Sequence, residues 1–279
     1  MGIMKGAGYI LDQLIRIDKK KYYENYPIKI KDGRIFYGNL KNIRYRSLFW
    51  HKVHERVESE LLSLLLREDD VFFDIGANIG WYTTLAAQIL KNGKVYAFEP
   101  IDEVANAIHF NSNNNGLTNI LVEKIALADF NGATNINFNK ENWGLSSLKV
   151  DNAGEEKISI TVKRLDDFVR ENKIEKITFI KCDIEGAEYL FLKGAILSLK
   201  KFSPVILMEI SASNLSAFKN TPIDIYKLLI GLGYKMFSIY PLKGKISLEE
   251  YLPTNNVEQQ NIIAFSTENK NLLKRLNTV

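Results

Sequence analysis

Apolar residues along the chain fall into two alternating patterns. Short runs rich in β-branched and aromatic residues predict buried strands, and between them apolar residues recur at helical spacing. The predicted strands cover residues 71–75, 94–100, 119–126, 176–183, 204–210, 235–239 and 261–265. Strands that alternate with helices in this order indicate an α/β fold with a parallel sheet.

Helical spacing predicts five helices, over residues 49–66, 81–90, 102–113, 184–200 and 222–233. The first of them carries four polar residues, which we interpret as a solvated helix face: His51, His54, Glu55 and Glu58. Two further strands, near 134–138 and 157–162, bracket a polar loop that contains residues 143–147. A loop of this length inside a compact domain is usually functional, so we expect it to cover the ligand crevice.

The N-terminal region differs from the rest of the chain. Residues 1–27 predict a short amphipathic helix with a basic end, interpreted as a docking or oligomerisation segment, with attachment to a membrane surface as the weaker alternative. Apolar and polar residues alternate in segments 28–31 and 34–37, which flank Asp32-Gly33. This pattern predicts a β-hairpin.

Small residues follow the first predicted sheet strand and mark a strand-to-helix turn. Asp74, Gly76, Asn78 and Gly80 are spaced two apart, and Thr83 lies in the first turn of the helix. A dinucleotide fingerprint needs glycines at offsets of about zero, two and five, so this spacing disfavours NAD. Asn tolerates positive φ better than other non-glycine residues. A structural turn without a ligand is the alternative reading.

A second acidic residue, Glu99, ends the next strand about twenty residues after the glycine turn. An acid at a strand end can accept two hydrogen bonds from a ribose diol, so the turn and Glu99 together predict a nucleoside site. The turn that begins at Ala126 is expected to flank the adenine.

Three more acids follow later strands of the sheet. Asp183, Glu185 and Glu209 are expected at the same carboxyl edge as Asp74 and Glu99. They are candidate general bases, with Lys181 assisting. Three converging acids could instead hold a divalent cation, although we do not predict a metal. Asp183 could also cap the following helix.

Five blocks of sequence resemble the FkbM family of methyltransferases, of which residues 180–188, Ile-Lys-Cys-Asp-Ile-Glu-Gly-Ala-Glu, are the most specific. The others are residues 74–80, which look like motif I of class I S-adenosylmethionine (SAM) methyltransferases, then 98–100, 164–168 and 208–210. The resemblance covers roughly residues 71–210. It implies a doubly wound, mostly parallel seven-stranded sheet, with residues 1–45 as an N-terminal helix and hairpin extension and 46–279 as the methyltransferase domain.

The resemblance also implies a function, SAM-dependent O-methylation. The acceptor would be a small molecule or glycan, such as a sugar hydroxyl in a surface polysaccharide or glycolipid, or a natural product. The cofactor site would then comprise Asp74, Gly76, Asn78, Gly80, Thr83, Glu99, Ala126 and Asp183. The catalytic set would be Asp183, Glu185 and Glu209. A non-catalytic protein that binds SAM or another nucleoside on the same fold is the alternative.

Composition limits the other classes of protein to which the chain could belong. The chain has 279 residues, a net charge of +4 and scattered lysines, which do not indicate nucleic-acid binding. Its one cysteine, Cys182, is expected to be a buried strand residue and favours a reducing, cytoplasmic location. No apolar run reaches the roughly 18 to 20 residues of a membrane helix. The three histidines show no metal-ligand spacing.

Overall fold

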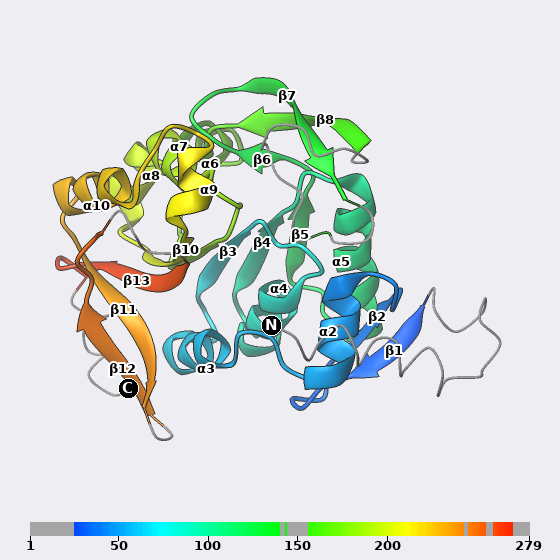
Figure 1. Ribbon diagram of the computed structural model, residues 1–279. Helices are drawn as coiled ribbons and strands as arrows, with labels where there is room; N and C mark the ends of the chain where they lie inside the picture. Colours follow the sequence, from blue (N-terminus) through cyan, green and yellow to red (C-terminus); the bar gives the residue numbers. More distant parts are fainter. Residues whose placement is uncertain (1–24, 140–142, 144–155, 243–244, 255–258, 270–279) are drawn as a thin grey trace.

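A central sheet organises the computed structural model (Figure 1), which describes residues 25–139, 143, 156–242, 245–254 and 259–269. Within these residues the sheet has eight strands. In spatial order they are β12 (Lys245–Glu250), β11 (Tyr234–Leu242), β13 (Gln260–Ser266), β10 (Val205–Ile210), β9 (Phe179–Cys182), β3 (Val71–Ile75), β4 (Lys94–Phe98) and β5 (Ile120–Glu123).

The order of the strands confirms the doubly wound α/β fold. Strands β10, β9, β3, β4 and β5 pair in parallel, and β13, β11 and β12 pair antiparallel. All seven predicted strands are present. β12 is an eighth, in a segment for which no strand was predicted. Strand β3 lies between β4 and β9, so the order reverses there and the turns after β3 and β9 share one crevice.

A second, three-stranded sheet lies above the carboxyl ends of the central strands (Figure 1). Its order is β6 (Ala126–Leu127), β8 (Glu156–Lys163) and β7 (Gly132–Phe138), which confirms the two strands predicted around the polar loop. Of that loop, the structure describes Trp143, so the rest of the predicted cover at 144–147 lies outside the described residues. The predicted N-terminal helix also lies outside them, apart from residues 25–27.

Helices cover both faces of the central sheet because its strands are apolar on both sides. One face packs against α3 (Arg56–Leu65), α4 (Trp81–Ile89) and α5 (Asp102–Asn114). The other packs against α6 (Leu165–Glu171), α7 (Glu188–Gly194), α8 (Ile196–Phe202), α9 (Ala212–Ser216) and α10 (Pro222–Gly231). Among the described helices none is long and apolar enough to cross a membrane. The cytoplasmic location stays a prediction.

Two predicted helices are interrupted. The helix expected over 49–66 is two helices, α2 (Ile43–His51) and α3, separated by a break in which Lys52 and Glu55 have φ of 56° and 41°. The helix expected over 184–200 begins only at Glu188, after an irregular turn, and is divided into α7 and α8 at Ala195. The break before α3 and the irregular turn before α7 both border the candidate site.

The predicted hairpin is present as β1 (Tyr26–Lys29) and β2 (Ile35–Gly38), and one buried cation attaches it to α4. The Arg34 side chain is fully buried and donates hydrogen bonds to the Trp81 carbonyl oxygen (2.6 Å) and to Thr84 Oγ1 (2.7 Å). Its guanidinium lies 4.5 Å from the Trp81 ring centroid and pairs with Asp32. The hairpin therefore holds the first helix after the glycine turn.

We predict that Arg34→Met lowers the free energy of unfolding by about 3 kcal/mol, because it removes buried charge-assisted hydrogen bonds to the Trp81 carbonyl oxygen and the Thr84 hydroxyl. Urea denaturation followed by circular dichroism measures this. The matched control is Arg56→Met, whose ion pair with Glu60 is largely solvent-exposed and whose loss should leave the urea midpoint unchanged. Equal midpoints for both variants and the wild type would contradict the role of Arg34.

Candidate active site

The glycine turn after β3 has the backbone that its sequence predicts. Gly76, Asn78 and Gly80 all have positive φ, at 78°, 50° and 82°. A Cβ atom on Gly76 would lie 2.0 Å from the carbonyl oxygen of Asp183, so the absence of a side chain lets this turn touch the end of β9. The two turns therefore meet across the crevice.

Asp74 is buried at the end of β3, at the wall of the crevice. Its Oδ2 accepts a hydrogen bond of 2.5 Å from the Thr83 hydroxyl. Burial raises the pKa of Asp74 to about 6, although this hydrogen bond and the charge of Lys181 oppose the rise. Thr83 itself does not contribute to the described wall, and its contact with the site is the hydrogen bond to Asp74.

Glu99 follows β4 and is 6% exposed, with its carboxylate at the crevice wall. One oxygen accepts from the Asn78 backbone N–H and the other from the Ile101 N–H, both at 3.1 Å. Burial raises the pKa of Glu99 to about 7, against the effect of these two hydrogen bonds. Each carboxylate oxygen can accept a second hydrogen bond, so Glu99 can hold the glycine turn and a diol together.

The turn between β9 and α7 is held by Glu188. Its Oε1 accepts hydrogen bonds from the backbone N–H groups of Ile184 (3.1 Å) and Gly186 (3.0 Å). Gly186 has a φ of 109°, and a Cβ there would lie 2.4 Å from the Asn214 carbonyl oxygen. Asp183 does not cap α7, whose N-cap position is Ala187, so the alternative role considered for Asp183 is wrong.

Glu185 has a positive φ of 54°, and its side chain points toward helices α9 and α2. Its Oε2 accepts a hydrogen bond of 2.9 Å from Asn214 Nδ2, and its Oε1 lies 4.0 Å from Arg44. Glu185 lines the crevice, but it is not grouped with Asp183 and Glu209 as the sequence analysis expected.

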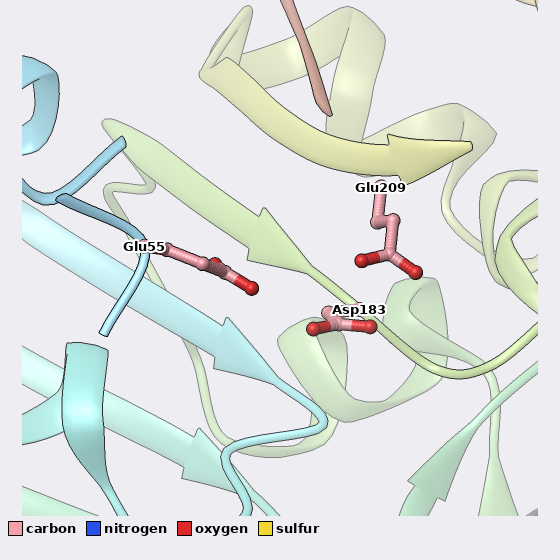
Figure 2. A group of neighbouring side chains, drawn as sticks. All are labelled: Glu55, Asp183 and Glu209. Atoms are coloured by element: carbon pink, nitrogen blue, oxygen red, sulfur yellow. The ribbon is translucent and has the colours of Figure 1, made fainter. Parts of the chain in front are cut away.

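Glu55 is the third member of that acidic group (Figure 2). One carboxylate oxygen from each of Glu55, Asp183 and Glu209 lies within 4.8 Å of the other two. Glu55 comes from the break between α2 and α3, and its Oε2 accepts a hydrogen bond of 2.5 Å from the Tyr82 hydroxyl. The reading of Glu55 and His54 as a solvated helix face is therefore wrong, because the helix is broken there and both turn inward.

Lys181 supplies the positive charge beside these acids. It is 1% exposed, and its Nζ lies 3.8 Å from Asp183 Oδ2. Burial alone would lower the pKa of Lys181, but the charges of Asp183, Glu55 and Glu209 raise it above its ordinary value, so the ammonium stays charged. The next residue, Cys182, is a buried free thiol, as predicted.

Glu209 ends β10 beside Asp183 and accepts a hydrogen bond of 2.8 Å from Gln259 Nε2. Burial and the charge of Asp183 raise the pKa of Glu209 to about 7, against the effects of Gln259 and Lys181. Its carboxyl group can therefore accept or release a proton near neutral pH.

The crevice has two halves: a glycine-turn half around Gly76 and Glu99, and an acidic half around Lys181 and Asp183. Of the residues named from sequence, the described wall contains Asp74, Gly76, Asn78, Glu99, Ala126, Asp183 and Glu185. Gly80, Thr83 and Glu209 adjoin that wall without forming part of it. The wall also contains Trp143, from the loop that was expected to cover the crevice, and residues that sequence reasoning did not place there: His54, Arg44, Tyr82, Ile136 and Val162.

The strand order and the position of this crevice define a class I, Rossmann-like methyltransferase fold. Residues 74–236 match the family model of the methyltransferase FkbM domain, which is more than half of the chain. The chain belongs to the FkbM methyltransferase family, as the resemblance predicted.

Three curated relatives are similar over about two thirds of their own lengths. The hexuronic acid methyltransferase AglP of Haloferax volcanii is 30% identical over 186 residues, covering 64% of this chain and 71% of the relative. The 2-O-methyltransferase NoeI of Sinorhizobium fredii is 27% identical, covering 52% and 65%. The 31-O-demethyl-FK506 methyltransferase FkbM of Streptomyces tacrolimicus is 29% identical, covering 54% and 66%.

We predict that Gly186→Ala destabilises the protein by about 2 to 4 kcal/mol, because Ala pays for the positive φ and its Cβ meets the Asn214 carbonyl. Thermal and urea unfolding measure the loss. Gly231→Ala is the control, since a Cβ on Gly231 meets nothing within 4 Å and its φ is not positive. Gly231→Ala should leave stability unchanged or raise it slightly. If the two variants behaved alike, the tight turn at Gly186 would not be needed.

Proposed function

We propose that the protein transfers a methyl group from SAM to a hydroxyl oxygen of a sugar, in a polysaccharide or glycolipid, or of a natural product. The family supports methyl transfer, and the names of the three relatives supply the acceptor classes: a hexuronic acid, a 2-O position and a 31-O-demethylated natural product.

The observation that carries the proposal is the Glu99 carboxylate at the crevice wall, bonded to the glycine turn through Asn78. The residues present fit the cofactor. A nucleoside needs a diol acceptor, close backbone approach and an apolar flank, which Glu99, Gly76 and the turn at Ala126 can supply. Asp74 and Asp183 would bind the cofactor beside them, with Asn78, Gly80 and Thr83 holding the turn and Asp74 in place.

When bound, SAM would supply a methyl group activated by a sulfonium. The protein has to hold the acceptor oxygen in line with that methyl group, and such positioning supplies about 7 to 11 kcal/mol in well-oriented reactions. Asp183 lies where the two turns meet, so it is suited to this positioning. Glu185 borders the acceptor half and would shape it through Asn214 and Arg44.

Glu209 is the best candidate for the general base. Its raised pKa, near 7, matches the pH at which a base accepts a proton and later releases it. Glu55 is less suited, because the charges of Lys181 and His54 and the hydrogen bond from Tyr82 lower its pKa despite its burial.

A non-catalytic protein that binds SAM is the competing function. Such a protein needs only the glycine-turn half of the crevice, which contains Asp74 and Glu99. The grouping of Glu55, Asp183 and Glu209 beside a buried Lys181 favours the enzyme, because burying the Lys181 ammonium and the Glu209 carboxyl group without a use is costly.

Transfer of a labelled methyl group separates these functions. The purified protein, labelled SAM and a panel of hexoses, uronic acids and surface glycans should give a labelled ether, located by mass spectrometry. Glycans from cells with and without the protein should differ by one methyl group at the same position. Tight SAM binding without transfer to any member of the panel would favour the non-catalytic function.

For cofactor binding, we predict that Glu99→Gln weakens SAM affinity at least tenfold, because a charge-assisted hydrogen bond is worth about 1.5 to 3 kcal/mol. The glutamine keeps one oxygen for the glycine turn, so the fold should persist. Isothermal titration calorimetry with SAM and its demethylated product measures the change. Glu103→Gln, on the exposed side of α5, is the control. Unchanged affinity would remove Glu99 from the site.

For catalysis, we predict that the transfer rate at saturating cofactor and acceptor rises as the pH passes upward through about 7, because Glu209 loses its proton there. The groups that set this titration are Asp183, Lys181, Glu185 and Gln259. Glu209→Gln should lower the rate about a hundred- to ten-thousand-fold and abolish the inflection. An inflection that survives in Glu209→Gln would assign the titration to another group.

A further inference from the structure

Lys181 is an unusual residue for the interior of a sheet. Its ammonium is buried at the end of β9 and, among the described residues, its Nζ has no hydrogen-bond partner. The ion pair with Asp183 spans 3.8 Å, which is too long for a hydrogen bond. The Tyr82 ring lies on another side, with its centroid 5.3 Å from Nζ. A buried charged donor normally has an acceptor, so Lys181 is built to bind one.

The three carboxylates near Lys181 are close enough together to ligate a single divalent cation. Asp183, however, is already the ion-pair partner of Lys181. The negative charges of the other two carboxylates also stabilise the charged form of its ammonium. A divalent ion among the same oxygens would be close to a fixed positive charge that burial prevents from moving into water. The ammonium and a metal ion therefore compete for one position.

We propose that Lys181 is the resident cation of the acceptor half of the crevice, where it takes the place of a divalent metal ion and binds the acceptor oxygen. This inference rests on the proposed methyl transfer and adds a catalytic residue to it. The acceptor hydroxyl accepts a hydrogen bond from Lys181 Nζ and donates its own to Glu209.

In the proton transfer, the acceptor O–H bond breaks and the proton forms a new O–H bond on the Glu209 carboxylate. The negative charge that develops on the acceptor oxygen is stabilised by the Lys181 ammonium, which keeps all its protons. Glu55 and Asp183 have a positioning role, because their charges keep Lys181 protonated and direct its Nζ toward the crevice.

Glu55 can perform this role because its own position is restrained. The Tyr82 hydroxyl donates to Glu55 Oε2, and the left-handed backbone at φ 41° and ψ 68° turns its side chain inward. Non-glycine residues in this conformation are strained, and such strain persists where the surrounding structure requires it.

Two measurements on the wild-type protein test the inference directly. Titration with Mn²⁺, followed by electron paramagnetic resonance without cofactor or acceptor, should detect no stoichiometric binding. Single-turnover methyl transfer should be unaffected by a chelator. The Mn²⁺ titration does not depend on methyl transfer, so it decides whether Lys181 or a metal ion is the resident cation even if no acceptor were methylated and the proposed function failed.

The variant Lys181→Met removes the charge and keeps the length of the side chain. We expect it to bind Mn²⁺, since three carboxylates lose their cation, and to transfer methyl at least about a hundredfold more slowly. Its SAM affinity should stay within about twofold of the wild type, since Glu99 and the glycine turn are intact. The control is Lys176→Met, because Lys176 pairs with Asp69 on the exposed surface before the strands begin. It should change none of these readouts.

Three results would overturn the inference: wild-type Mn²⁺ binding that Glu209→Gln abolishes, loss of activity on chelation, or a folded Lys181→Met that transfers methyl at the wild-type rate or binds no Mn²⁺. If Lys181→Met fails to fold, the two wild-type measurements still decide between a resident lysine and a metal ion.

Discussion

The close approach of two turns is the constraint on which the site depends. Strands β3 and β9 are neighbours, and the turns that follow them touch because Gly76 has no side chain to separate its backbone from the Asp183 carbonyl. Any larger residue would displace one turn by the width of a methyl group. That displacement would separate the Glu99 side of the crevice from Lys181 and Asp183. The contact at Gly76 thus joins the glycine-turn half of the crevice to the acidic half.

Burial gives the acids of the crevice different proton affinities. It raises the pKa of Asp74 to about 6 and those of Glu99 and Glu209 to about 7, whereas nearby positive charges and a tyrosine hydroxyl keep Glu55 below its ordinary value. Carboxylates whose pKa values are separated in this way can take separate roles. A persistent anion can support Lys181, while a carboxylate that titrates near neutrality can exchange a proton.

Much of the fold was predictable from sequence because the five parallel strands are apolar on both faces and short turns separate them from helices. The edge strand β12 was missed although Ile246 and Leu248 alternate with polar residues, because two apolar positions in a short segment are a weak strand signal. The break before α3 was also missed, since residues 52–55 contain neither glycine nor proline. Only tertiary packing holds Lys52 and Glu55 in the left-handed region.

The same distinction explains how far the site was predictable. Asp74, Glu99 and Asp183 end predicted strands, and strand ends of a parallel sheet share one edge, so their approximate positions follow from sequence. Glu185 was expected to join Asp183 and Glu209, but Gly186 and the Glu188 side chain turn the backbone so that Glu185 contacts Asn214. Glu55 took its place from a segment more than a hundred residues earlier, a contact that local patterns do not encode.

The two halves of the crevice also differ in their relation to the family. Residues that form the glycine-turn half, from Asp74 to Ala126, lie within the matched span of 74–236. The acidic half takes Glu55 from before that span and Gln259, which bonds Glu209, from after it. Segments outside the shared core therefore complete the acidic half of the crevice. In the proposed methyl transfer, this division would let one scaffold keep its donor site while the flanking segments determine which acceptor hydroxyl lies against Lys181.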